Sequence, residues 1–238
     1  MSKHLSTHKI WEKKYINNVI NGLNFYSNKK NLISKDIYVI DIGGNIGSYS
    51  FLLGKLGYNL ITFEPSKINY YILNKNYCLN KEVNVTLINK GLFSEEKRCY
   101  IYSPTKNMGN GMICNKKPIK HYINNGEIIL TKLSNYISFF ENKNLALIKM
   151  DIEGSEGKAF ESGIELITKY HVPFIILEFT PKYLLLYGTD PQKFLKMFIS
   201  NGYKINILNF FEKKNYDMEY LLKLKNSNLY IVYSPFLK

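Results

Sequence analysis

A buried strand that runs directly into a glycine turn is the feature that most constrains the fold. Residues 37–40 read Ile-Tyr-Val-Ile, a short and mostly β-branched run typical of a strand covered on both faces. The run continues through Asp41 into Ile-Gly-Gly-Asn-Ile-Gly, and a helix is expected over 49–56. A strand, a turn and a helix in this order indicate an α/β unit.

The same alternation continues along the chain. Further strands are predicted at 60–63, 83–88, 145–150, 174–177, 203–208 and 229–233, and further helices at 70–76, 156–170 and 191–201. Strands that alternate with helices pair in parallel through right-handed crossovers. We therefore expect an α/β fold with a mostly parallel sheet, helices on both faces and a late antiparallel pair.

Two stretches lie outside this alternation. Residues 1–35 are expected to form an N-terminal helical cover, because apolar residues at positions 16, 19, 20 and 23 share one helical face, whereas 24–35 is polar and should break the helix. Residues 93–131 carry short predicted strands at 99–102 and 127–131 around a loop rich in Lys, Asn and Gly. We interpret 93–131 as an insertion, in the form of a hairpin, within one domain over 36–238.

The chain is strongly basic, with 32 Lys and Arg against 19 Asp and Glu, a net charge of +13. Arg98 is the only arginine. Arginine is the residue best suited to bidentate recognition of phosphates and bases. The composition therefore favours a solvated lysine surface over a specific nucleic-acid partner, and an anionic partner remains the alternative.

Composition excludes several classes of protein. A hydrophobic content of 45% argues against disorder, and no apolar run approaches the ~18 residues of a membrane helix. The first 14 residues lack the apolar core of a secretory signal. Cys78, Cys99 and Cys114 form no C-x-x-C pair, and the four histidines have no metal-ligand spacing. We expect reduced thiols, a cytoplasmic protein and no metal.

The glycine turn indicates a ligand site, because glycines let the backbone approach a ligand at the carboxyl end of a strand. The dinucleotide fingerprint G-x-G-x-x-G fails, since the second and third glycine positions hold Asn45 and Ser48. Asp41, placed before the turn, suits a cationic ligand better than a pyrophosphate. S-adenosylmethionine (SAM) offers a sulfonium and an amine. The alternative is a tight turn without a ligand.

A second acidic residue closes the next predicted strand. Glu64 stands 21 residues after Gly43 and could accept hydrogen bonds from both hydroxyls of a ribose. The alternative is that Glu64 is a surface glutamate before a proline turn. The glycine turn upstream favours the ribose contact over this alternative.

The block K-M-D-I-E-G-S-E that begins at Lys149 brings further charges to the same edge. In an extended segment, Lys149, Asp151 and Glu153 point to one side. Two close carboxylates raise the pKa of at least one of them, which suits a general base, and Lys149 would keep the other ionised. Glu178 ends the fifth predicted strand and opens onto this edge. Glu156 is expected to serve the helix dipole instead.

Four motifs therefore follow one another: D-I-G-G-N-I-G-S-Y-S from Asp41, F-E-P at 63–65, K-M-D-I-E-G-S-E from Lys149, and I-L-E ending at Glu178. This order resembles the FkbM family of SAM-dependent methyltransferases, over roughly residues 37–180. The resemblance implies a Rossmann-like sheet of seven strands with an antiparallel C-terminal strand. It also implies SAM as cofactor and methyl transfer to an oxygen of a sugar or small molecule. One departure is Leu133-Ser134, where the family often has Leu-Asp.

The resemblance also implies residue roles. The residues expected to bind the cofactor are Asp41, Gly43, Asn45 and Gly47 at the methionine end and Glu64 at the ribose. The residues expected to face the acceptor and act in catalysis are Asp151, Glu153 and Glu178. Asp151, or Glu153 through a water, would take the proton of the acceptor hydroxyl.

Two other functions remain open on the sequence. An RNA 2′-O-methyltransferase would suit the net charge, and Lys149, Asp151 and Glu178 match part of a Lys-Asp-Lys-Glu tetrad, but no second lysine stands at a strand end. A non-catalytic module with a methyltransferase fold would act through its basic surface. The preferred partner is a small-molecule or carbohydrate acceptor.

Overall fold

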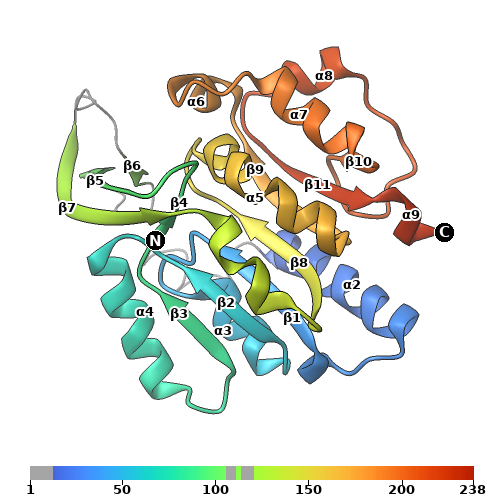
Figure 1. Ribbon diagram of the computed structural model, residues 1–238, viewed down its shortest axis with the longest axis horizontal. Helices are drawn as coiled ribbons and strands as arrows, with labels where there is room; N and C mark the ends of the chain where they lie inside the picture. The colour runs from blue at the N-terminus through green and yellow to red at the C-terminus, as the bar shows by residue number, and fades with distance from the viewer. Residues whose placement is uncertain (1–12, 106–110, 114–120) are drawn as a thin grey trace.

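The computed structural model describes residues 13–105, 111–113 and 121–238, and these form two sheets (Figure 1). The larger sheet has seven strands in the order β10-β11-β9-β8-β1-β2-β3. Its strands are β1 (Ile37–Ile42), β2 (Asn59–Phe63), β3 (Val85–Ile88), β8 (Asn144–Met150), β9 (Phe174–Phe179), β10 (Tyr203–Asn206) and β11 (Ser227–Tyr233). The first five run parallel, and β11 runs antiparallel to β9 and β10. The predicted α/β sheet is confirmed.

Helices cover both faces of this sheet. The described helices are α2 (Lys13–Lys30), α3 (Ser48–Lys55), α4 (Lys67–Leu79), α5 (Glu156–Tyr170), α6 (Pro181–Leu186), α7 (Pro191–Ser200), α8 (Met218–Leu222) and α9 (Ser234–Leu237), with 3-10 turns η1 (Ser34–Asp36) and η2 (Leu133–Phe140). Successive residues of β1, Val39 and Ile40, enter different cores, one with residues of α2 and α3 and the other with residues of α5 and α7. Both faces are therefore buried, which explains the continuous apolar run.

The N-terminal helix is longer than its polar sequence suggests. The expected break at residue 24 is wrong, because α2 continues to Lys30. Tyr26 is buried and belongs to the core beneath α2, and the ring of Phe25 packs edge-on against Phe174 at 6.4 Å. These two aromatic residues extend the apolar face through the otherwise polar segment.

The smaller sheet has the order β4-β7-β5-β6 in the described residues. Its strands are β4 (Gly91–Leu92), β5 (Lys97–Pro104), β6 (Met112–Ile113) and β7 (Tyr122–Thr131). A separate small core supports it and contains Ile101, Ile113 and Leu130. The hydroxyl of Tyr187 donates a hydrogen bond to the carbonyl of Ile113 at 2.9 Å, so the segment after α6 is tied to this sheet.

Two expectations drawn from composition concern the cysteines and membrane-spanning helices. Cys99 takes part in a disulfide whereas Cys78 is free and exposed, so the expectation of reduced thiols is wrong at Cys99. Cys114 lies outside the described residues. None of the helices in the described ranges has the length and hydropathy of a membrane span.

Candidate active site

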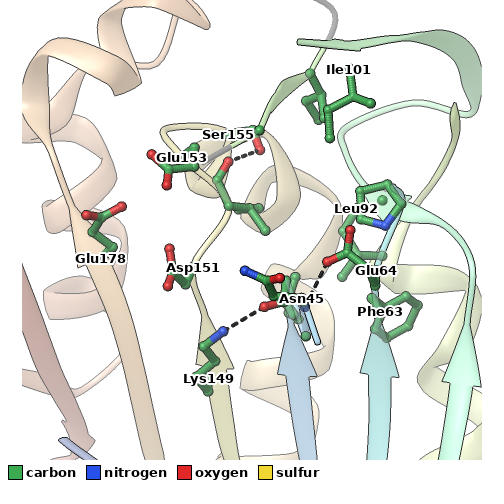
Figure 2. A pocket seen from close by; sticks show the side chains of 18 of the residues that line it. Asn45, Phe63, Glu64, Leu92, Ile101, Lys149, Asp151, Glu153, Ser155 and Glu178 are labelled. Carbon is green, nitrogen blue, oxygen red and sulfur yellow. Dashed lines mark hydrogen bonds between the residues drawn. The ribbon is translucent and has the colours of Figure 1, made fainter. Parts of the chain in front are cut away.

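A cavity of about 380 Å³ opens where β1, β2, β8 and β9 end (Figure 2). Its volume lies in the range of small-molecule sites, and parallel sheets bind ligands at this edge. The lining residues most important for the chemistry are Gly43, Asn45, Glu64, Lys149, Asp151, Glu153 and Glu178. The motifs that lie far apart in the sequence therefore meet in one cavity.

The glycine turn after β1 is tied to β2 by its backbone. The N–H groups of Gly43 and Gly44 both donate to the carbonyl of Phe63, at 2.9 and 3.0 Å. Gly43 has a φ of +78°, and a Cβ built there would lie 2.0 Å from the carbonyl oxygen of Asp151. The position therefore requires glycine on two grounds, backbone conformation and space.

Glu64 is buried at the end of β2, and its carboxylate accepts two backbone hydrogen bonds. The N–H of Asn45 donates to Oε2 and that of Ser66 to Oε1, each at 2.8 Å. Burial raises the pKa of Glu64 from 4.5 to about 7, and these hydrogen bonds and the charge of Lys149 oppose the rise. The side chain of Asn69 also hydrogen-bonds to this carboxylate. Because a carboxylate offers about four acceptor positions, it keeps room for a ligand hydroxyl.

Two of the expected cofactor residues do not line the cavity. Asp41 is only 1% exposed: its Oδ2 accepts a hydrogen bond from Ser50 Oγ at 2.6 Å, and its Oδ1 lies 3.2 Å from Lys149 Nζ. Gly47 precedes α3 with a φ of +96°, and a Cβ there would meet the ring of Phe51 at 2.3 Å. Both residues lie behind the turn that faces the cavity.

Lys149 makes two contacts that the sequence did not predict. The ion pair that the structure shows for it is with Asp41, and Nζ also donates to the carbonyl of Gly43 at 2.8 Å. The expectation that Lys149 would also keep a neighbouring acceptor-side carboxylate ionised stays a prediction. The side chain turns toward β1 because Lys149 and Asp41 are direct partners in the β1–β8 register.

Asp151, Glu153 and Glu178 form an acidic group on the opposite side of the cavity (Figure 2). One carboxylate oxygen from each lies within 4.8 Å of the others. Burial, followed by the negative charges of Glu178 and Asp151, raises the pKa of Glu153 from 4.5 to about 9. Glu153 is therefore protonated at neutral pH and can donate a hydrogen bond, while a neighbouring carboxylate can accept a proton.

Glu156 lies behind this acidic group and does not line the cavity. It is 1% exposed, and its Oε1 accepts a hydrogen bond from the N–H of Ile152 at 3.1 Å. Burial raises its pKa to about 8. This hydrogen bond holds the turn between β8 and α5, so we interpret Glu156 as a structural residue.

One wall of the cavity was not predicted from the sequence. Leu92, Ile101 and Ile113 of the smaller sheet line it together with Gly91. Gly91 and Leu92 follow the end of β3, so the rule that ligands bind after the strands could have found them. Ile101 and Ile113 are ordinary apolar residues, and no local signal separates them from the core.

Comparisons with known proteins identify a family and similar folds. The family model described as methyltransferase FkbM domain matches residues 41–205. A medium-resolution structure of the bifunctional kinase-methyltransferase WbdD aligns with a TM-score of 0.52 at 12% identity, over 93% of this chain and 39% of that one. A 2.2 Å crystal structure of WbdD aligns with a TM-score of 0.54 at 11% identity, over 93% and 40%. The latter two show likeness of fold, and this chain spans about two fifths of the WbdD chains. No curated protein matches the sequence significantly.

Proposed function

The chain belongs to the FkbM methyltransferase domain family, and from this membership we propose that it transfers a methyl group from SAM to an oxygen of a small molecule or sugar. The observation that carries the proposal is one cavity with two chemically different sides. A glycine turn and Glu64 stand on one side, and Asp151, Glu153 and Glu178 stand on the other.

The first side fits the proposed cofactor. The buried carboxylate of Glu64 can accept a hydrogen bond from a ribose hydroxyl, and Gly43 to Asn45 line the cavity. When bound, SAM would supply an electrophilic methyl group on a sulfonium. In this proposal Asp41 and Gly47 act indirectly, by shaping the turn that the cofactor contacts.

The second side supplies the acid–base chemistry. Asp151 would accept the proton of the acceptor hydroxyl, and the protonated Glu153 would donate a hydrogen bond that fixes the acceptor or Asp151. Ile101 and Ile113 would keep water from the reacting oxygen. Much of the rate would then come from positioning, as is usual for a displacement between two bound reactants.

The charges in the cavity also favour one class of acceptor. Three acidic side chains face the acceptor side, and the lysine that lines the cavity is engaged by Asp41 and Gly43. A phosphate placed beside those carboxylates would meet repulsion. We therefore favour a neutral or cationic hydroxylated acceptor over RNA, despite the net charge of +13.

Two measurements test the proposal. Calorimetric titration with S-adenosylhomocysteine should show binding, and radiolabelled SAM should transfer label to members of a panel of neutral sugars and aminosugars more readily than to sugar phosphates or RNA oligonucleotides. Absence of binding would overturn the cofactor assignment. Preferred labelling of RNA would favour the rival 2′-O-methyltransferase.

A further inference from the structure

We propose that Lys149 is a positioning residue for the cofactor, which fixes the glycine turn by holding the carbonyl of Gly43. The proposal rests on the cofactor site proposed above. It assigns Lys149 to the shape of the turn and not to proton transfer at the acceptor.

The geometry places Lys149 between two groups of the neighbouring strand. Its side chain is 10% exposed, and Nζ lies 2.8 Å from the carbonyl oxygen of Gly43 and 3.2 Å from Asp41 Oδ1. Figure 2 shows the side chain directed toward the turn, below the acidic group. The ring of Tyr49 lies 5.4 Å from Nζ, so an aromatic face also borders the charge.

Hydrogen bonds hold the glycine turn on both of its sides, and the side chain of Lys149 supplies one from β8. On the β2 side, Gly43 and Gly44 donate to the carbonyl of Phe63, and Asn45 donates to Glu64. These bonds fix the N–H groups of the turn. The carbonyl of Gly43 points the other way and is fixed by Lys149. A charged donor makes a stronger bond than a neutral one.

Balancing the charge of Asp41 does not by itself require a lysine at position 149. Asp41 is 1% exposed, and its other oxygen already accepts a hydrogen bond from Ser50. Replacing both members of a buried ion pair by well-packed apolar residues is often neutral for stability, so charge balance alone gives no reason to keep the pair. The bond to the Gly43 carbonyl is what a lysine adds beyond charge balance, and this bond belongs to the turn.

The experiment separates these two contributions with three variants. Asp41→Asn keeps the bond from Lys149 to Gly43. Lys149→Met removes the ammonium and leaves Asp41 buried without its cation, and the double variant Asp41→Asn/Lys149→Met buries neither charge. The matched control is Lys158→Met, which removes a lysine paired with Glu161 on α5 at 2.6 Å. For each, affinity for S-adenosylhomocysteine is measured by calorimetry and melting temperature by differential scanning calorimetry.

We expect Lys158→Met to bind S-adenosylhomocysteine within about threefold of the wild type. Asp41→Asn, which keeps the bond from Lys149 to Gly43, should bind at least about tenfold more tightly than the double variant. Lys149→Met should lower the melting temperature and weaken binding on the order of tenfold to a hundredfold, the scale of a charged hydrogen bond. The double variant should recover melting temperature, because no unpaired charge is buried, yet bind as weakly as Lys149→Met. The comparison of Asp41→Asn with the double variant isolates the bond to Gly43 even where Lys149→Met does not fold.

Recovery of both stability and affinity in the double variant would show that Lys149 serves only to balance Asp41, and would overturn the proposal. Normal affinity in a folded Lys149→Met variant would overturn it as well. If the wild-type chain itself fails to bind S-adenosylhomocysteine, the proposed function falls together with this role. That outcome is distinct from wild-type binding with unaffected variants.

Discussion

Glu64 and Asn45 are joined by a hydrogen bond of 2.8 Å, from the main-chain N–H of Asn45 to Oε2 of the buried carboxylate. Asn45 belongs to the turn after β1 and Glu64 to the end of β2, so the bond makes the two proposed cofactor-binding segments one unit. A change at Glu64 is therefore expected to act twice, on the ribose contact and on the shape of the turn.

Glu64→Gln is expected to weaken binding of S-adenosylhomocysteine by roughly tenfold to a hundredfold. The amide nitrogen of glutamine cannot accept a hydrogen bond, so the N–H of Asn45 or of Ser66 would lose its partner. Calorimetric titration measures the effect. Glu82→Gln, an exposed glutamate beside β3, serves as control. Equal affinity in the two variants would contradict the role of Glu64.

Asp151→Asn is expected to lower turnover by about 10²–10⁴-fold, the usual contribution of a general base. The backbone N–H of Asp151 donates to the carbonyl of Ile42 at 3.1 Å, and this bond survives the substitution. Affinity for SAM should therefore stay within about threefold. Steady-state kinetics and titration on one preparation test this, with Glu161→Gln on α5 as control. Normal turnover in a stable, SAM-binding variant would exclude Asp151 as the base.

The raised pKa of Glu153 predicts how stability depends on pH. With a pKa of about 9 instead of 4.5, the folded chain retains a proton that the unfolded chain releases. The free energy of unfolding should therefore fall as pH rises from about 5 to about 9, by at most about 1.4 kcal/mol per pH unit from this group. Glu64 and Glu156, with pKa values raised to about 7 and about 8, act in the same direction over narrower ranges.

Glu153→Gln should therefore flatten this dependence and exceed the wild type in stability at pH 8.5. Urea unfolding at pH 5.5, 7.0 and 8.5 measures it, with Glu161→Gln expected to follow the wild type. Parallel curves for Glu153→Gln and wild type would show that Glu153 does not hold a proton in the folded state.

Turnover is expected to be independent of divalent metal. In the acidic group, a proton on Glu153 relieves the repulsion among three carboxylates whose oxygens lie within 4.8 Å. Dialysis against EDTA should therefore leave methyl transfer unchanged. Loss of activity that Mg²⁺ or Mn²⁺ restores would contradict this prediction and assign a cation to Asp151, Glu153 and Glu178.

The strands of the main sheet could be read from the sequence because their signal is local. β8 was predicted at 145–150 and spans Asn144–Met150, since its residues enter the cores on both faces and almost all are apolar. Short helices such as α6 and α8 were missed because five or six residues carry too little periodicity. The C-terminal limit of α2 was missed because Phe25 and Tyr26 pack in an otherwise polar segment.

In the candidate site, too, the features with a local sequence signal were predicted and those without one were not. The acidic residues at the strand ends were found because charges at the ends of buried strands are unusual. The partner of Lys149 was not found, because it depends on the register between β1 and β8, which no local pattern specifies. Ile101 and Ile113 were missed for a related reason: only the pairing of β5 with β6 places them at the cavity.

The segment that forms the smaller sheet begins and ends side by side, because β4 pairs with the end of β7 through Gly91 and Leu130. The apolar wall of the cavity is thus encoded by one continuous segment, whereas the glycine turn, Glu64 and the acidic group are encoded outside it. Under the proposed function, substitutions at Ile101 or Ile113 should therefore alter the choice of acceptor and leave the residues of the proposed methyl-donor side unchanged.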